Sequence, residues 1–407
     1  MTEKNQPVVA GTASALTRVH RHLCVALLVL LGFSLGCSEF VVIGIEPDLA
    51  TAFSVPLARA GELISFFAVT YAAATPVLAL TTGRFRRFQL LVAYSAIFVL
   101  ANLVQAMAPS FEVLLASRVL IGAVSGALLA VGVTYLPELL GPERTSMAIS
   151  VVYAAFSVAM VLSTSAGKLV AELLTWHVAL WATLVLAVAT CAALVAVLPR
   201  EGATDEPATF SEQVGLLAEP QAITGILIFV FGVGSVYVLY GYVTPYLEDV
   251  LGMGALAASG ALMAYGGMCF ISNLISGWVD SHVGMRALLV SFPVQAALLL
   301  AVWLAGPAMP LGLGLILAVG LSMYIVSVPC VTMFMRTATE RHPKALTLAS
   351  SLEPMAFNIG IAFGTAVGGA VVSGPGLAHV GLVGAAFSLV ACALVAVTLR
   401  LARRAVR

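Results

Sequence analysis

Residues 23–45 read LCVALLVLLGFSLGCSEFVVIGI, and Glu39 is the one charged side chain in this stretch. A membrane-spanning α-helix needs about 20 consecutive apolar residues, so the stretch predicts a span. It is too long for the apolar region of a cleaved leader, and no small-residue cleavage site follows it, so we expect it to be retained. Of all 407 residues, 61% are hydrophobic and 9% are charged, whereas a soluble domain carries about 25% charged residues. The chain is therefore predicted to be a multi-pass membrane protein.

Further apolar runs follow the first one, separated by polar residues, proline or glycine. Several loops between them are very short, so neighbouring helices are expected to run antiparallel. The predicted fold class is an all-α membrane protein with twelve transmembrane helices. The predicted spans are residues 23–45, 57–80, 89–108, 112–134, 147–170, 178–198, 221–243, 255–278, 287–305, 311–333, 347–370 and 380–399.

The positions of the basic residues predict the orientation of the chain in the membrane. With the N-terminus in the cytoplasm, 16 of the 19 Lys and Arg residues fall on the inner side. Arg59 and Lys168 fall at outer ends, and Arg118 lies within a span. Cytoplasmic loops of membrane proteins carry this excess of positive charge, so both termini are predicted to be cytoplasmic.

A polar stretch at residues 200–220 separates two sets of six predicted spans. An offset of 198 residues brings Pro47 onto Pro245 and Gly122 onto Gly320, which supports an internal repeat. Two parallel six-helix repeats form one transporter architecture, with the binding site between the halves near the bilayer midplane. The predicted domains are an N-terminal bundle at 1–199, a cytoplasmic linker at 200–220 and a C-terminal bundle at 221–407.

Composition and missing motifs exclude several functions. Equal numbers of acidic and basic residues, 19 each, give zero net charge and argue against a nucleic-acid partner. Gly167 and Lys168 are followed by Leu169, so this is not a nucleotide-binding P-loop. No set of His, Ser and Cys at one depth indicates an enzyme. All six cysteines lie in predicted spans and no histidine lies mid-membrane, so neither a disulfide nor a metal site is expected. No cofactor is expected, and any transport would be driven by an ion gradient or by the gradient of the substrate itself.

Glu39 and Arg118 are costly charges inside the first and fourth predicted spans. A charge at a helix centre costs about 2.5–3.5 kcal/mol on insertion scales, so its retention indicates a function. At about 1.5 Å per residue, both lie at a similar depth from the outer side. Glu39 shares a helix face with Gly32 and Gly36, a spacing that lets another backbone approach closely. One interpretation is a proton-binding carboxylate tuned by desolvation and a nearby guanidinium, and the other is a structural ion pair.

Glu353 is a third acid within a predicted span, and it precedes Pro354. It is interpreted either as a second contact for protons or substrate, or as a charge tolerated where the proline frees backbone groups and water enters. Lys168 and Glu172 are instead expected to be interfacial charges. Polar and aromatic side chains on central spans predict a mostly apolar cavity that suits an amphipathic small molecule. The cavity candidates are Phe33, Tyr71, Ser125, Tyr237, Tyr240, Tyr265, Tyr324, Phe357 and Asn358.

These residues resemble the motifs of a known family. Three sets of residues resemble the first-, fourth- and eleventh-helix signatures of the major facilitator superfamily. In that order, they are Ser38-Glu39-Phe40 with Gly44 and Pro47-Asp48, Arg118 with Gly122 and Gly126, and Phe357-Asn358-Ile359-Gly360 with Gly364. Within it, the chain resembles the twelve-span drug:proton antiporters, and most of all the bacterial sugar-efflux and chloramphenicol-exporter group. The resemblance covers the whole chain. It implies that the fourth-helix arginine takes part in proton coupling.

The resemblance also implies a cytoplasmic gate at the loop between helices 2 and 3 and at its second-half copy. The gate candidates are Gly83, Arg84, Arg86, Arg87, Asp280 and Arg286. The family's loop normally contains an aspartate, but no acid lies between Ala79 and Phe88 here. The fifth-helix antiporter motif is also altered, because Ser163 and Ser165 stand where glycine and proline are expected.

The expected function is proton-coupled efflux of a small organic molecule, such as a drug, sugar or metabolite, by alternating access. The expected partners are protons, the substrate and the lipid bilayer. The protein is expected to be a monomer in the bacterial inner membrane. One alternative is a uniporter or proton symporter of a sugar-like metabolite on the same fold. A membrane enzyme, a non-transporting receptor or a structural membrane protein are alternatives of other classes. The sequence does not identify the substrate, because fold alone does not determine function.

Overall fold

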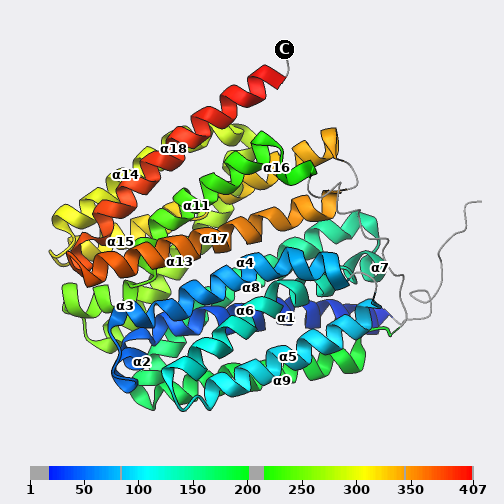
Figure 1. The fold of residues 1–407 in the computed structure, drawn as a ribbon, viewed down its shortest axis with the longest axis horizontal. Coiled ribbons are helices and arrows are strands. Elements are labelled where there is room, and N and C mark those ends of the chain that lie inside the picture. The colour runs from blue at the N-terminus through cyan, green and yellow to red at the C-terminus, as the bar shows by residue number, and fades with distance from the viewer. Residues whose placement is uncertain (1–17, 83–84, 201–214, 343–344, 406–407) are drawn as a thin grey trace, which may run out of the picture.

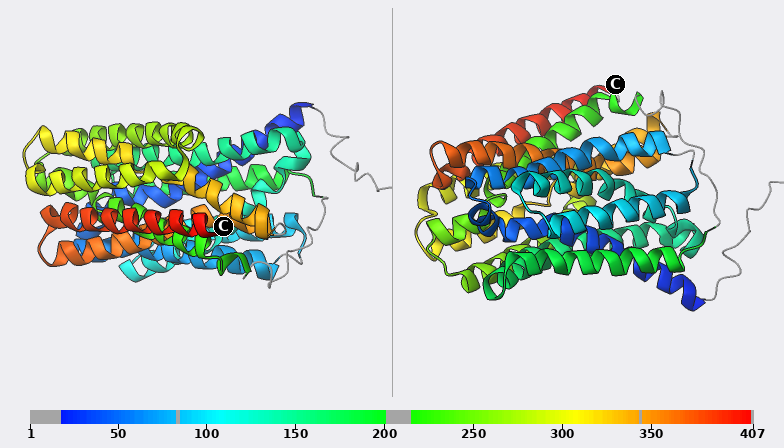
Figure 2. Two further views of the ribbon diagram at one scale, coloured as in Figure 1. Left: turned by 90° about the horizontal axis from the view of Figure 1, so that it is seen from above. Right: turned by 60° about the horizontal axis from the view of Figure 1, so that its bottom comes forward.

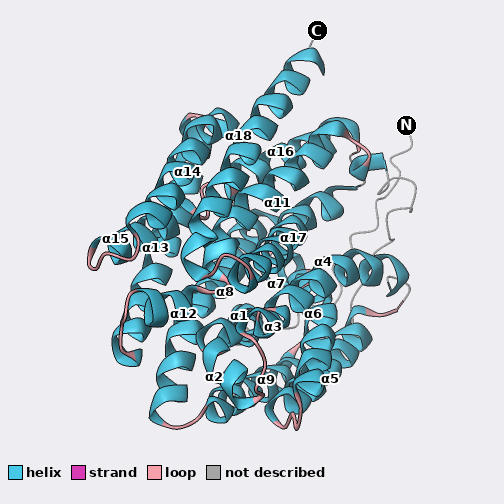
Figure 3. Ribbon diagram, turned by 60° about the vertical axis from the view of Figure 1, so that its left-hand side comes forward, coloured by secondary structure: helices cyan, strands magenta, loops and turns pink. Residues whose placement is uncertain are grey.

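The computed structural model describes residues 18–82, 85–200, 215–342 and 345–405, and in these residues it contains helices and no strand (Figure 3). The helices that precede the polar stretch are α1 (Arg18–Gly44), α2 (Glu46–Ala52), α3 (Leu57–Ala60), α4 (Glu62–Thr82), α5 (Arg87–Ala106), α6 (Phe111–Val133), α7 (Leu136–Leu140), α8 (Pro142–Leu173) and α9 (Trp176–Val197). Those that follow it are α11 (Pro220–Tyr240), α12 (Val243–Pro245), η2 (Tyr246–Val250), α13 (Ala255–His282), η3 (Gly284–Ala287), α14 (Leu288–Ala305), α15 (Leu311–Ser322), α16 (Ser327–Arg341), α17 (Leu346–Ser373), η5 (Leu377–His379) and α18 (Val380–Ala405).

Among the described residues, 12 helical segments are long and apolar enough to cross a membrane, which confirms the predicted fold class. Helix ends differ from the prediction by several residues in places. For example, α8 begins at Pro142, and the tenth segment continues through α16 to Arg341. Proline is favourable at the first helical position because its missing N–H has no helical partner there. Polar ends such as these extend a helix beyond its apolar run, so hydropathy alone underestimates its length.

The helices form an elongated bundle in which α1–α9 pack mainly among themselves and α11–α18 do the same (Figures 1 and 2). The two groups repeat one packing order: α1 against α8 and α9 is matched by α11 against α17 and α18. The two groups meet where α4 packs against α17 and where α8 packs against α13. The predicted linker falls largely on residues 201–214, which lie outside the described residues. The division into two domains therefore stays a proposal.

Glycines allow the closest helix contacts in each group. Gly32 and Gly36 of α1 face α8, where an added Cβ at Gly36 would lie 2.8 Å from the Ala159 Cβ and 2.9 Å from the Phe156 carbonyl oxygen. In the second group, Gly360 and Gly364 of α17 face α11 in the same way. Membrane helices associate through such small residues because lipid provides no hydrophobic drive for their pairing.

We expect Gly36→Ala to destabilise the protein, because the new methyl group forces α1 and α8 apart. Overpacking of a well-packed contact costs about 1–3 kcal/mol, so the midpoint of thermal unfolding in detergent should fall by several degrees. Gly260→Ala on α13 is the matched control, since an added Cβ there meets open space. An equal or smaller loss of stability in Gly36→Ala than in the control would contradict this packing.

Contacts between the two groups gather at the end of the bundle that contains α2 and α3, on the left in Figure 1. The Thr244 hydroxyl donates to the Ile43 carbonyl at 2.7 Å, and the Ser259 hydroxyl donates to the Ser165 carbonyl at 2.8 Å. We call this end the α2 end, and the opposite end, where α7 lies, the α7 end. Because twelve segments cross the bundle, α1 begins and α18 ends at the α7 end.

Candidate functional site

A cavity of about 120 Å³ lies between the two groups of helices. Both groups supply its wall, so a change in their relative position changes its shape. Some of the side chains that line the cavity are partly exposed, such as Asn273 and Glu353, and others are buried, such as Glu39. The lining residues are Glu39, Phe40, Tyr71, Leu129, Phe156, Ser157, Asn273, Tyr324, Ser327, Glu353, Pro354, Phe357 and Asn358.

Glu39 reaches the cavity from α1 and is 5% exposed. Its Oε2 atom is buried and has no hydrogen-bond partner among the described residues. The helix face predicted from Gly32 and Gly36 is the face that packs on α8, so the carboxyl points into the protein and not into lipid. A buried carboxyl oxygen without a donor is costly, so it is suited to accept a proton or a donor from a ligand.

Arg118 lies behind Glu39 and is completely buried. Its guanidinium donates to the Ser38 carbonyl at 2.7 Å, the Glu39 carbonyl at 2.9 Å and the Leu63 carbonyl at 3.1 Å. It also lies 4.4 Å from the centre of the Phe67 ring. Arg118 therefore ties α6 to the backbones of α1 and α4, and its hydrogen bonds reach the Glu39 backbone while the carboxyl faces the cavity. The two predicted residues do come together, in a geometry that periodicity does not reveal.

Glu353 lines the same cavity from α17, opposite the group that carries Glu39. One turn later, the Asn358 amide nitrogen donates to the Pro354 carbonyl at 3.1 Å. The Asn358 Oδ1 atom is buried and has no partner among the described residues. The cavity wall thus presents acceptor oxygens from both groups of helices.

Aromatic rings form much of the rest of the wall. Tyr324 and Phe357 stack with their ring centres 5.3 Å apart, and both line the cavity. Tyr237 packs edge-on against Phe357, and Tyr240 stacks on Tyr265 behind them. These three tyrosines are almost fully buried, so they support the wall and do not line it.

The predicted site residues therefore divide into two sets. Glu39, Tyr71, Tyr324, Glu353, Phe357 and Asn358 line the cavity, whereas Phe33, Ser125, Tyr237, Tyr240 and Tyr265 lie outside its lining. Ser125 is buried and donates to the Ile121 carbonyl of its own helix. Sequence reasoning missed Asn273 and Ser327, which are polar residues at helix positions where periodicity gave no distinguishing signal.

The α2 end contains a three-charge cluster that the sequence does not predict. The Lys168 ammonium lies 2.8 Å from a Glu248 carboxylate oxygen and 3.5 Å from an Asp48 oxygen. Lys168 is 3% exposed, because its ammonium lies between these two acids. Its partners come from η2 and α2, which approach α8 only in the folded protein. We call Asp48, Lys168 and Glu248 the Lys168 cluster, and it joins the two groups of helices.

The gate candidates at the α7 end have partners within their own group. Arg87 forms an ion pair with Glu138 of α7 and lies 4.3 Å from the centre of the Tyr135 ring. Glu138 thus supplies an acid where the helix 2–3 loop has none. Asp280 accepts a hydrogen bond from Thr332 at 2.7 Å. Arg86 and Arg286 are exposed, and Gly83 and Arg84 lie outside the described residues.

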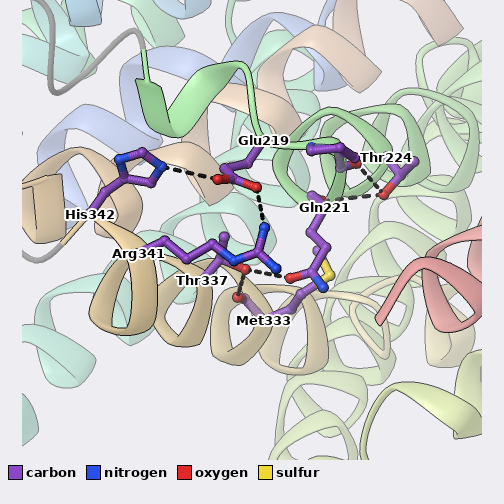
Figure 4. A network of polar contacts seen from close by, with 8 residues as sticks. Glu219, Gln221, Thr224, Met333, Thr337, Arg341 and His342 are labelled. Atoms are coloured by element: carbon purple, nitrogen blue, oxygen red, sulfur yellow. Dashed lines mark hydrogen bonds and ion pairs between the residues drawn. The ribbon is translucent and has the colours of Figure 1, made fainter. Parts of the chain in front are cut away.

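A polar network fastens the start of α11 to the end of α16 (Figure 4). Glu219 receives Arg341 at 2.6 Å and His342 at 3.1 Å, while the Thr337 hydroxyl donates to Gln221 at 2.8 Å. All five residues belong to the second group of helices. The network therefore holds this end of that group together and leaves the first group independent of it.

No metal centre is found in the described part of the chain, where no cluster of three or more His, Cys, Asp or Glu side chains could hold an ion. The six cysteines are free, and five of them are buried.

A membrane bundle with a polar-lined cavity between two similarly packed groups of helices is the general form of a secondary transporter. The family model that matches residues 28–353 describes the Major Facilitator Superfamily. The chain belongs to this superfamily. It is a multi-pass membrane transporter and not an enzyme.

Several known proteins are similar to the chain. It is 28% identical over 353 residues to the uncharacterized MFS-type transporter YtbD of Bacillus subtilis (strain 168), covering 86% of this chain and 89% of YtbD. It is 29% identical over 373 residues to the inner membrane transport protein YdhP of Escherichia coli (strain K12), covering 90% of this chain and 94% of YdhP. A crystal structure of a bacterial homolog to the human lysosomal transporter Spinster, inward-facing and unoccupied, has a TM-score of 0.74 at 15% identity and covers 95% of this chain and 98% of that one. This last likeness concerns the fold.

Proposed function

We propose that the protein is a proton-coupled antiporter that exports a small organic molecule across the bacterial inner membrane. The observation that carries the proposal is the buried, unpartnered Oε2 of Glu39 in the cavity wall, with the Arg118 guanidinium bound to the backbone behind it. A carboxyl in this position exchanges a proton for a substrate contact without rearranging the helices around it.

We further propose that the termini are cytoplasmic, so that the α2 end faces outward. Sixteen of the 19 basic residues are then on the inner side, as the positive-inside rule requires. The contacts between Thr244 and Ile43 and within the Lys168 cluster then close the outer end. The similar Spinster homolog was solved in an inward-facing conformation, which supports reading the present arrangement as inward-facing.

Antiport requires that proton and substrate favour opposite conformations. In the proposed cycle, Glu39 takes a proton while its cavity is open to the outside and releases it to the cytoplasm in the inward-facing state. The substrate then binds to the cavity wall, where the Glu39 carboxyl has lost its proton. The two groups of helices move relative to each other as the proposed domains, and this rearrangement exposes the bound substrate to the outside.

We propose that the preferred substrate is an amphipathic organic cation. The described lining residues include two carboxyls, two amides and several aromatic rings, and none of them is basic. Stacked aromatic faces such as Tyr324 and Phe357 attract cations through their ring electrons. A cation also competes directly with the proton for Glu39.

Export is tested in proteoliposomes that contain the purified protein and a fluorescent aromatic cation. We expect cation movement to be accompanied by proton flux in the opposite direction. A uniporter would move the cation without proton flux, and a symporter would move both in the same direction, so either result rejects the proposal.

We expect Glu353→Gln to weaken cation binding while proton exchange continues. Loss of one carboxylate contact at about 1.4 kcal/mol corresponds to a tenfold rise in KM. A neutral amphiphile of the same size should be unaffected, and Glu172→Gln, an exposed acid on α8, is the control. An equal loss of affinity for neutral and cationic compounds would show that Glu353 has no role in charge recognition.

A further inference from the structure

Glu46 is a buried acid that the transport cycle above does not use. It is the first residue of α2 and follows the corner at Ile45, where α1 ends. Its side chain is 0% exposed, and both carboxyl oxygens lack a hydrogen-bond partner among the described residues. It therefore differs from Asp48 and Glu248 at the same end, whose charges lie beside the Lys168 ammonium.

The surroundings of Glu46 come from both groups of helices. Burial raises the pKa of Tyr242, which lies between α11 and α12, and the charges of Glu46 and of Glu62 at the start of α4 add to this rise. The Tyr242 hydroxyl donates to the Thr365 carbonyl of α17 at 3.2 Å, and its ring fills the space left by Gly61. The other charged groups around this corner form the Lys168 cluster on α2, α8 and η2.

Among the described residues, no hydrogen-bond donor compensates an ionised Glu46 carboxylate. Burial without hydrogen bonds or an adjacent cation disfavours the charged form, and it raises the pKa of Glu46 well above its usual range. The enclosure depends on contacts between the two groups, because α12 packs on α2 and the Thr244 hydroxyl is bound to Ile43. Separation of the groups at this end would admit water to Glu46.

We propose that Glu46 is a second proton-binding site, occupied when the outer end is closed and vacated to the outside when that end opens. This inference rests on the alternating access and the orientation in the proposed function. On closure, the Glu46 carboxylate takes one proton from outside water, and on opening it returns that proton to the same side. Glu46 therefore transports no charge, but it makes closure of the outer end depend on external pH.

The direction of this dependence follows from linkage. The closed state binds the proton more tightly than the open state, so acid favours closure. Between the two proton affinities, each tenfold rise in proton concentration raises the closed-to-open ratio by up to tenfold. The pH dependence of closure lies above the ordinary carboxyl pKa of about 4.3, because burial raises the pKa of Glu46 in the closed state. External acid thus favours closure of the outer end. It thereby also favours the change to the inward-facing state, which follows proton binding at Glu39 in the proposed cycle.

The test uses spin labels on both sides of the outer end. The six native cysteines are replaced by alanine, and labels are attached at Ala52→Cys on α2 and Leu256→Cys on α13, both exposed positions. Glu39→Gln is included so that the central carboxyl does not contribute. Distance distributions are measured between pH 5 and 9, roughly the range over which a carboxyl of raised pKa titrates. We expect the shorter, closed population to increase as pH falls.

Adding Glu46→Gln should make the closed population dominant and independent of pH, since a neutral amide replaces the titrating group. Glu46→Leu should give the same result, and Glu62→Gln should retain the pH response. The proposal would be overturned if the closed population of the Glu39→Gln protein did not depend on pH. It would also be overturned if the closed population still depended on pH after Glu46→Gln was added.

A transport measurement separates this inference from the proposed function. Glu46→Gln alone should exchange the same number of protons per substrate as the wild type, and a lower number would overturn the role proposed here. If the wild type shows no proton exchange at all, the antiport proposal fails, while the spin-label result still decides whether Glu46 controls the outer end.

Discussion

Glu39→Gln is expected to abolish proton-driven export. The amide has the size of the carboxyl but cannot carry the exchanged proton, so a pH gradient should no longer concentrate substrate. Folding should be preserved, because Oε2 of Glu39 has no hydrogen-bond partner to lose among the described residues and Arg118 binds the backbone carbonyl instead. In proteoliposomes, uphill transport should fall to the level of empty vesicles. Exchange of labelled for unlabelled substrate, which needs no proton, should continue with a higher KM, because the amide loses the charge that the cation contacts.

The matched control is Glu172→Gln, which removes an exposed acid from the same group of helices. It should leave uphill transport and thermal stability unchanged. If Glu39→Gln still concentrates substrate against its gradient, the coupling carboxyl lies elsewhere. Loss of exchange together with uphill transport would instead indicate that Glu39 is needed for substrate binding and not for coupling.

The sequence predicts the spans well because each is a continuous apolar run whose requirement is local. It also identifies Glu39 and Arg118, because a charge inside such a run is rare and costly. The detailed geometry is not local. Helical periodicity predicts that both residues face protein, but only the folded helices show that the guanidinium binds the Ser38 and Glu39 carbonyls.

The residues that sequence reasoning missed depend on long-range packing. Glu46 stands in a short polar turn, Glu46-Pro47-Asp48, of the kind that usually lies in water. It is fully buried where α2 packs against α12 of the other group of helices. Lys168 has an acid, Glu172, four residues away in the sequence, whereas its ion-pair partners come from α2 and η2. Short-range spacing does not contain this information.

In the proposed orientation, and with Glu46 in its proposed role, closure of the outer end involves two kinds of acid. The acids of the Lys168 cluster are compensated by an ammonium group, so they contribute attraction between the two groups of helices. Glu46 has no such compensation and opposes closure while it is ionised. Since the two effects act on one interface, a proton at Glu46 changes the balance without altering the cluster.

Arg118→Met is expected to separate the structural and functional roles of the buried guanidinium. Met is similar in volume and neutral, and the substitution also removes the cost of keeping a charge away from water. The Ser38, Glu39 and Leu63 carbonyls lie within helices α1 and α4, so they keep their intrahelical donors. We expect a thermal midpoint near that of the wild type, retained substrate exchange and a fall in proton-driven transport of more than about tenfold, or 1.4 kcal/mol.

The reason for this expected split is the position of Arg118 behind the coupling carboxyl. A nearby cation favours the ionised form of a carboxyl, so removal of the guanidinium makes proton release to the cytoplasm harder while the cavity wall stays in place. Arg118→Lys keeps the charge but loses the planar set of three donors, and it should restore part of the transport. If Arg118→Met lowers stability and exchange together and Arg118→Lys restores both equally, the arginine only holds α1, α4 and α6 together. Coupling would then have to be assigned to Glu39 without its guanidinium.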